Sequence, residues 1–147
     1  VQFLAEVSEA VAPVHAATAA DLLGMVGWAG LPPEAAAAAL RAQGLEPTAA
    51  RGWRGISSHV TASVGWSLYA FLQSPDGYWE AVCIAITVGG DSDTLAAMTG
   101  GIAGARLGAA AIPIQYREQL TDRGRWSAAE LLHLAATVHR RVGGGIP

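Results

Sequence analysis

The sequence predicts an all-α protein, and three observations support this fold class. No stretch alternates apolar and polar residues with the period of two that marks a half-buried strand. β-Branched residues are few, whereas alanine is abundant. Apolar residues recur instead at helical spacing, as Leu4, Val7 and Val11 do near the N-terminus. With 52% hydrophobic residues, the chain can also bury a substantial core.

Helix signals divide the first part of the chain into three helices and a loop. The first helix is expected over residues 1–11 and the second over residues 14–28. A third, over residues 31–43, has Pro33 near its start, and proline is tolerated in a first helical turn. Residues 45–55 contain proline and glycine without helical periodicity, and they predict a loop.

Capping signals place the remaining helices. Ser57 or Ser58 is expected to cap one helix, and Ser74 the next, with Pro75 at its first helical position. Ser127-Ala128-Ala129-Glu130 is a capping box that opens the last helix. We expect helices over residues 58–73, 75–88, 94–108, 114–120 and 128–142, followed by a tail over residues 143–147.

Bulk properties exclude several classes of protein. The net charge of −3 argues against a nucleic-acid-binding protein, which usually presents a basic face. The single cysteine, Cys83, excludes a disulfide framework, and its apolar neighbours predict a buried thiol. A membrane-spanning helix needs about 20 apolar residues in a row, and the sequence has no such run. We therefore expect a cytoplasmic protein outside the membrane. The length fits one domain over residues 1–147.

Glycine recurs at every fourth position in the segment after residue 94, at Gly100, Gly104 and Gly108. In a membrane, such spacing is a helix-packing motif. In a soluble protein, the same stripe lets a neighbouring helix approach closely, and this is the interpretation we favour.

The turn Gly89-Gly90-Asp91-Ser92-Asp93-Thr94 is the strongest functional signal. It places two carboxylates between two apolar segments, where an unpaired charge would be costly. Mg²⁺ and Mn²⁺ prefer oxygen ligands of this kind. Asp91, Asp93 and Thr94 are therefore candidate metal ligands, and Gly89 and Gly90 would let the backbone come close to the ions. The alternative is that Asp91 or Asp93 only caps the following helix, and one turn can do both.

The wider sequence resembles the ADP-ribosylglycohydrolase family, which includes the dinitrogenase reductase activating glycohydrolase. The blocks that carry the resemblance keep their order and spacing: SVGWSLYAFL (63–72), YWEAV (78–82), VGGDSDTLAAMTGGIAGA (88–105) and IP (112–113). The resemblance implies a multi-helix orthogonal bundle with a binuclear Mg²⁺ or Mn²⁺ centre. It further implies hydrolysis of the glycosidic bond between ADP-ribose and a protein side chain or related acceptor.

Position by position, Asp91, Asp93 and Thr94 match the second metal motif of this family. By the same resemblance, His59 and Val60 lie at the edge of the substrate cleft, although His59 could equally be a solvated residue at a helix start. Family members carry an earlier Thr-Asp-Asp motif with the other metal ligands, and this chain has none. We therefore expect the C-terminal half of a longer protein, with the unknown catalytic acid or base in the other half and little activity in these residues alone.

Two functions follow as hypotheses. The first is a metal-dependent hydrolase that acts on an ADP-ribosylated protein or a small ADP-ribose conjugate. The second is a non-catalytic helical domain that binds ADP-ribose or has a structural role. The sequence does not decide between Mg²⁺ and Mn²⁺, or among acceptors and oligomeric states.

Overall fold

The computed structural model describes residues 2–46 and 52–142, and these residues confirm the all-α prediction. They contain no strand, apart from one isolated bridge between Ile56 and Gly90. The chain groups into two compact units, one ending at Leu107 and one beginning at Gly108. That residues 1–147 act as one domain stays a prediction. Residues 143–147, the expected tail, lie outside the described residues.

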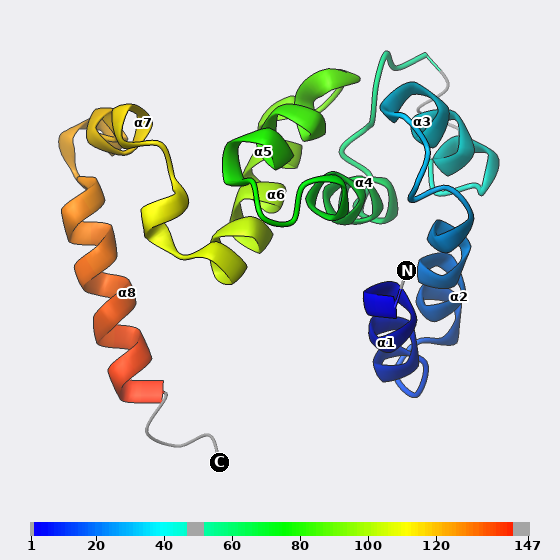
Figure 1. Ribbon diagram of the computed structural model, residues 1–147, viewed down its shortest axis with the longest axis horizontal. Coiled ribbons are helices and arrows are strands. Elements are labelled where there is room, and N and C mark those ends of the chain that lie inside the picture. Colours follow the sequence, from blue (N-terminus) through cyan, green and yellow to red (C-terminus); the bar gives the residue numbers. More distant parts are fainter. Residues whose placement is uncertain (1, 47–51, 143–147) are drawn as a thin grey trace. The chain divides into compact units, whose positions relative to one another are not determined.

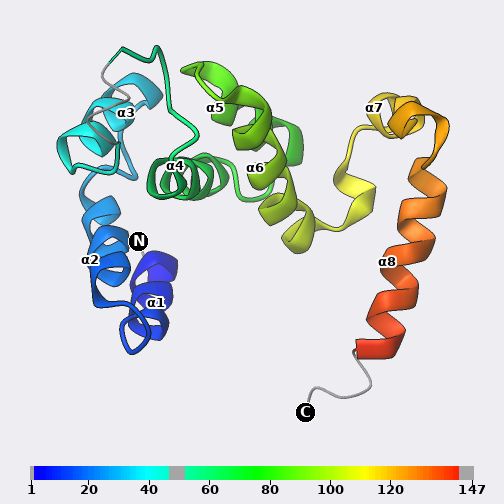
Figure 2. The ribbon, with the colours of Figure 1, turned by 180° about the vertical axis from the view of Figure 1, so that it is seen from behind.

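The first unit begins with three helices and a short 3-10 turn: α1 (Gln2–Val11), α2 (Ala16–Gly24), η1 (Met25–Gly27) and α3 (Pro33–Ala42). Helix α1 packs against α2 (Figures 1 and 2). The second helix is shorter than predicted at both ends. It begins at Ala16 because the His15 Nδ1 atom caps it, accepting from the Thr18 amide at 3.2 Å, and it tightens into η1 at Met25.

Three further helices complete this unit: α4 (Val60–Gln73), α5 (Tyr78–Thr87) and α6 (Ser92–Leu107). Each of them packs against the other two, and α5 and α6 lie side by side in both views (Figures 1 and 2). The fully buried Trp66 stacks on Tyr69, with the two ring centroids 4.6 Å apart. Its indole N–H donates to the carbonyl of Ala85 at 2.9 Å. This contact fixes α4 against α5.

Two predicted helix caps are wrong. Helix α4 starts after His59, and neither Ser57 nor Ser58 caps it. Helix α5 starts after Gly77, and Ser74 instead ends α4, with its amide bonded to the Phe71 carbonyl. The residues that follow Ser74 are therefore available for hydrogen bonds with another helix.

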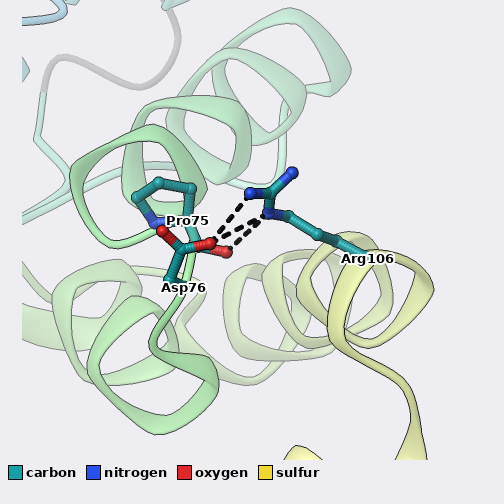
Figure 3. Close-up of polar contacts among 3 residues, drawn as sticks. All are labelled: Pro75, Asp76 and Arg106. Carbon is teal, nitrogen blue, oxygen red and sulfur yellow. Dashed lines mark hydrogen bonds and ion pairs between the residues drawn. The ribbon is translucent and has the colours of Figure 1, made fainter.

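Pro75 and Asp76, which were expected to open α5, belong to the loop before it. Arg106, in the last turn of α6, donates from Nη2 to an Asp76 carboxylate oxygen at 2.8 Å and from Nε to the Pro75 carbonyl at 3.1 Å (Figure 3). The ion pair is exposed, so its contribution to stability is small.

The glycine stripe is confirmed at two of its three positions. A Cβ atom at Gly100 would lie 2.9 Å from the Tyr78 hydroxyl, and one at Gly104 would lie 3.8 Å from the Tyr78 ring. Gly108 follows α6 with φ of +78°, and nothing lies within 4 Å of its Cβ position. None of the described helices is long and apolar enough to cross a membrane. Cys83, expected to be buried, is only half-buried.

The second unit contains η3 (Ala109–Ala111), α7 (Ile114–Gln119), η4 (Asp122–Gly124) and α8 (Ala128–Val142). The capping box at the start of α8 is confirmed. The Glu130 carboxylate accepts from the Ser127 amide at 2.7 Å, and the Ser127 hydroxyl accepts from the Glu130 amide at 3.3 Å.

Candidate functional site

The first part of the Gly89–Thr94 segment, Gly89 to Asp91, lies between α5 and α6 as predicted, and the rest begins α6. Gly89 and Gly90 both have positive φ, +73° and +94°, which a glycine adopts without steric cost. They turn the chain sharply from the end of α5 into Asp91. Asp93 was expected in the turn itself, but it lies in the first turn of α6, because the helix already begins at Ser92.

A second segment, Gly55-Ile56-Ser57, holds this turn through its backbone. The Ile56 amide donates to the Gly89 carbonyl at 3.1 Å, and the Asp91 amide donates to the Ile56 carbonyl at 2.9 Å. The two backbones are so close that a Cβ atom at Gly55 or at Gly90 would clash with the opposite segment. One at Gly55 would lie 2.1 Å from the Gly89 carbonyl oxygen, and one at Gly90 would lie 2.0 Å from the Ile56 carbonyl oxygen. The position of Asp91 is therefore set by a segment more than 30 residues earlier.

The two acids lie one residue apart at the start of α6. Hydrogen bonding with the Asp91 side chain, and then with the backbone N–H groups of Asp93 and Thr94, holds the pKa of Asp93 below its usual range. The Asp91 carbonyl accepts the first hydrogen bond of α6, from the Leu95 amide at 3.0 Å. Asp91 is half-buried and Asp93 is exposed, so solvent and ligands can reach both carboxyls. A capping role and a ligand role are both compatible with this geometry.

These residues fit part of an oxygen-ligated metal site. Asp91 and Asp93 are one residue apart and neither is fully buried, so both carboxylates are available to a cation, and the Thr94 hydroxyl follows in sequence. Within residues 2–46 and 52–142, no three His, Cys, Asp or Glu side chains gather as a metal-binding group. Mg²⁺ favours octahedral coordination, so a cation at this turn needs further oxygen ligands.

His59 lies on the segment that continues from Ile56. His59 follows Ile56 by three residues, so its Cα lies within roughly 11 Å of the Ile56 Cα, the reach of an extended chain. His59 is exposed, and Val60 is 66% exposed. Val60 lines a cavity of about 160 Å³ whose walls come from α2, η1 and α4 together with the loop after α3: Thr18, Asp21, Leu22, Met25, Leu45, Val60, Thr61, Val64 and Gly65.

Sequence reasoning missed the residues that support the turn. Both Glu46 carboxylate oxygens accept from Ser57, one from its amide at 2.8 Å and one from its hydroxyl at 2.5 Å. Arg41 donates to the Gly55 carbonyl. The one available signal was a glycine directly before the apolar Ile56 in a polar loop, which is typical of close backbone approach.

Comparison with known proteins identifies the family. The model of the ADP-ribosylglycohydrolase family matches residues 2–144, nearly the whole chain. No curated protein and no solved structure matched. The chain therefore belongs to the ADP-ribosylglycohydrolase family, as the sequence motifs predicted, and this membership supports hydrolysis of ADP-ribose linkages.

Proposed function

We propose that the full-length protein is a metal-dependent hydrolase that cleaves the glycosidic bond between ADP-ribose and a modified protein side chain or a related acceptor. The observation that supports this most is that Asp91 and Asp93 lie one residue apart beside a glycine turn, neither of them fully buried, in a member of this family. A turn that only capped α6 would not require two acids.

Asp91, Asp93 and Thr94 would hold Mg²⁺ or Mn²⁺, in a binuclear centre completed by other oxygen ligands. Such cations would orient the ribose hydroxyls and a water molecule and stabilise charge as the bond breaks. Both metals accept carboxylate and hydroxyl oxygens, so either fits this donor set.

The chain's own residues provide the frame of this site. Gly89 and Gly90 keep side-chain bulk away from the turn, and the bonds to Ile56 fix where α6 begins. His59 and Val60 lie on the segment that continues from Ile56 and would meet a substrate bound at the turn. His59 would contact the polar part of ADP-ribose, while the catalytic acid or base is not assigned to any residue described above.

The proposal is tested by removing metal from the full-length protein. The chelated protein should release no ADP-ribose from an ADP-ribosylated protein substrate, and added Mg²⁺ or Mn²⁺ should restore release. Undiminished release after complete chelation would reject metal dependence. Binding of ADP-ribose without any release, in the presence of either metal, would instead favour the non-catalytic alternative.

A further inference from the structure

We infer that Glu46 is a positioning residue for the Asp91–Asp93 turn, acting through Ser57 and Ile56. The inference rests on the proposed metal-binding function of that turn and names a residue outside the motif on which the turn depends. It starts from the two hydrogen bonds by which the Glu46 carboxylate holds Ser57.

The contacts of Ser57 make Glu46 the anchor of its segment. Ser57 is 4% exposed, and its amide and hydroxyl both donate to Glu46. The Ser57 hydroxyl accepts from the His59 amide at 3.2 Å, and the Ser57 carbonyl accepts from the Ser63 hydroxyl at 3.0 Å. Through Ser57, the Glu46 carboxylate thus holds both the segment that contacts the turn and the residues that lead to His59.

The connection from Ser57 to the turn is rigid. Ile56, the preceding residue, is fully buried and exchanges two backbone hydrogen bonds with Gly89 and Asp91. The missing Cβ atoms at Gly55 and Gly90 leave the two backbones in direct contact. A displacement of Ser57 must therefore move Ile56, and with it the amide of Asp91. Close-packed groups transmit such shifts rather than absorb them.

Charge chemistry explains why a carboxylate serves as the anchor. Hydrogen bonds to an ionised acceptor are shorter and stronger than neutral ones, and Glu46 makes two of them to one residue. In Glu46→Gln, an amide oxygen can still accept from the Ser57 amide, but the bonds lose their charge. In Glu46→Ala both bonds are lost. The series wild type, Glu46→Gln, Glu46→Ala should therefore show graded effects.

Two readouts test the inference in the full-length protein. The first is hydrogen exchange of the Ile56 and Asp91 amides in the absence of metal, which reports local opening of the turn. The second is the half-saturating concentration of Mn²⁺, the apparent Kd fitted to the rise of the melting temperature with Mn²⁺ concentration. We expect faster exchange of both amides in Glu46→Ala and a half-saturating concentration raised by about tenfold, the lower end for loss of a supporting partner.

Matched variants separate positioning from general destabilisation. Glu9→Gln, an exposed acid on α1, should change neither readout. Val7→Ala, which trims a half-buried contact of the core, should lower the melting temperature without shifting Mn²⁺ half-saturation. Ser57→Ala removes the hydroxyl that Glu46 binds, so its effect on Mn²⁺ half-saturation should not add to that of Glu46→Ala.

The outcomes are distinguishable. Unchanged amide exchange in Glu46→Ala overturns the inference, and so does faster exchange with an unchanged Mn²⁺ response. If wild-type protein shows no stabilisation by Mn²⁺ or Mg²⁺, the proposed function fails, and the positioning role fails with it. A shift in Glu46→Ala that Val7→Ala reproduces would reduce Glu46 to a structural residue.

Discussion

Replacing Gly90 by alanine should destabilise the protein more than replacing its neighbour Gly89. Both glycines have positive φ, so either substitution places an L-residue in a left-handed conformation, at about 1–2 kcal/mol. At Gly89 nothing lies within 4 Å of the new Cβ, so the substitution adds no further loss of unfolding free energy. At Gly90 the new Cβ would lie 2.0 Å from the Ile56 carbonyl oxygen, which must withdraw.

That withdrawal breaks the two backbone hydrogen bonds of Ile56, to Gly89 and from Asp91, each worth about 0.5–1.5 kcal/mol. The free energy of unfolding should therefore fall by about 2–5 kcal/mol in Gly90→Ala and by about 1–2 kcal/mol in Gly89→Ala. Gly101→Ala is the control, because this exposed helical glycine has an open Cβ position and should gain about 0.5–1 kcal/mol.

Urea unfolding monitored by circular dichroism measures all three variants against wild type. A loss in Gly90→Ala no greater than that in Gly89→Ala would refute the close contact between Ile56 and the turn. It would also remove the physical basis for transmitting a shift from Ser57 to Asp91.

Two further predictions concern the packing of α6 and the start of α8. Gly104→Leu should lower the unfolding free energy by about 1–3 kcal/mol, since its branched side chain must displace the Tyr78 ring, and an unchanged urea midpoint would show that the site has room. Hydrogen bonds from the Ser127 amide and hydroxyl lower the pKa of Glu130, so its stabilisation of α8 is complete above the ordinary glutamate pKa of 4.5 and is lost as the pH falls through the lower folded-state pKa. Helicity followed by circular dichroism should therefore fall on acidification, and Glu130→Gln should weaken that pH dependence; an identical profile in the variant would exclude Glu130 as its source.

The parts of the fold that the sequence predicts well are those governed by local physics. Helical periodicity placed α5 and α6, and the Ser127–Glu130 capping box was confirmed down to its hydrogen bonds. The cap predicted at Ser57 was wrong because this serine has a tertiary partner. Ser57 could have capped α4, but Glu46 binds its hydroxyl, and this partner lies 11 residues away.

The same distinction applies to the candidate site. Asp91 and Asp93 stand out in the sequence because two acids follow a pair of glycines. Their support by Ile56 depends on a backbone contact between segments more than 30 residues apart, and no local pattern encodes it. Whether these acids bind metal stays a prediction.

In the proposed site, Asp93 is a metal ligand and more than a helix residue. The most direct measurement is release of ADP-ribose from a modified protein at saturating Mg²⁺ or Mn²⁺ by full-length Asp93→Ala, beside melting curves with and without metal. Asp76→Ala, which removes an exposed acid paired with Arg106, is the control.

We expect Asp93→Ala to fold, to lose stabilisation by metal, and to release ADP-ribose at least about 100-fold more slowly, beyond the loss typical of a supporting partner. Asp76→Ala should keep both the metal response and turnover. Normal turnover and normal metal stabilisation in Asp93→Ala would contradict the metal role and leave Asp93 as a residue of the first turn of α6.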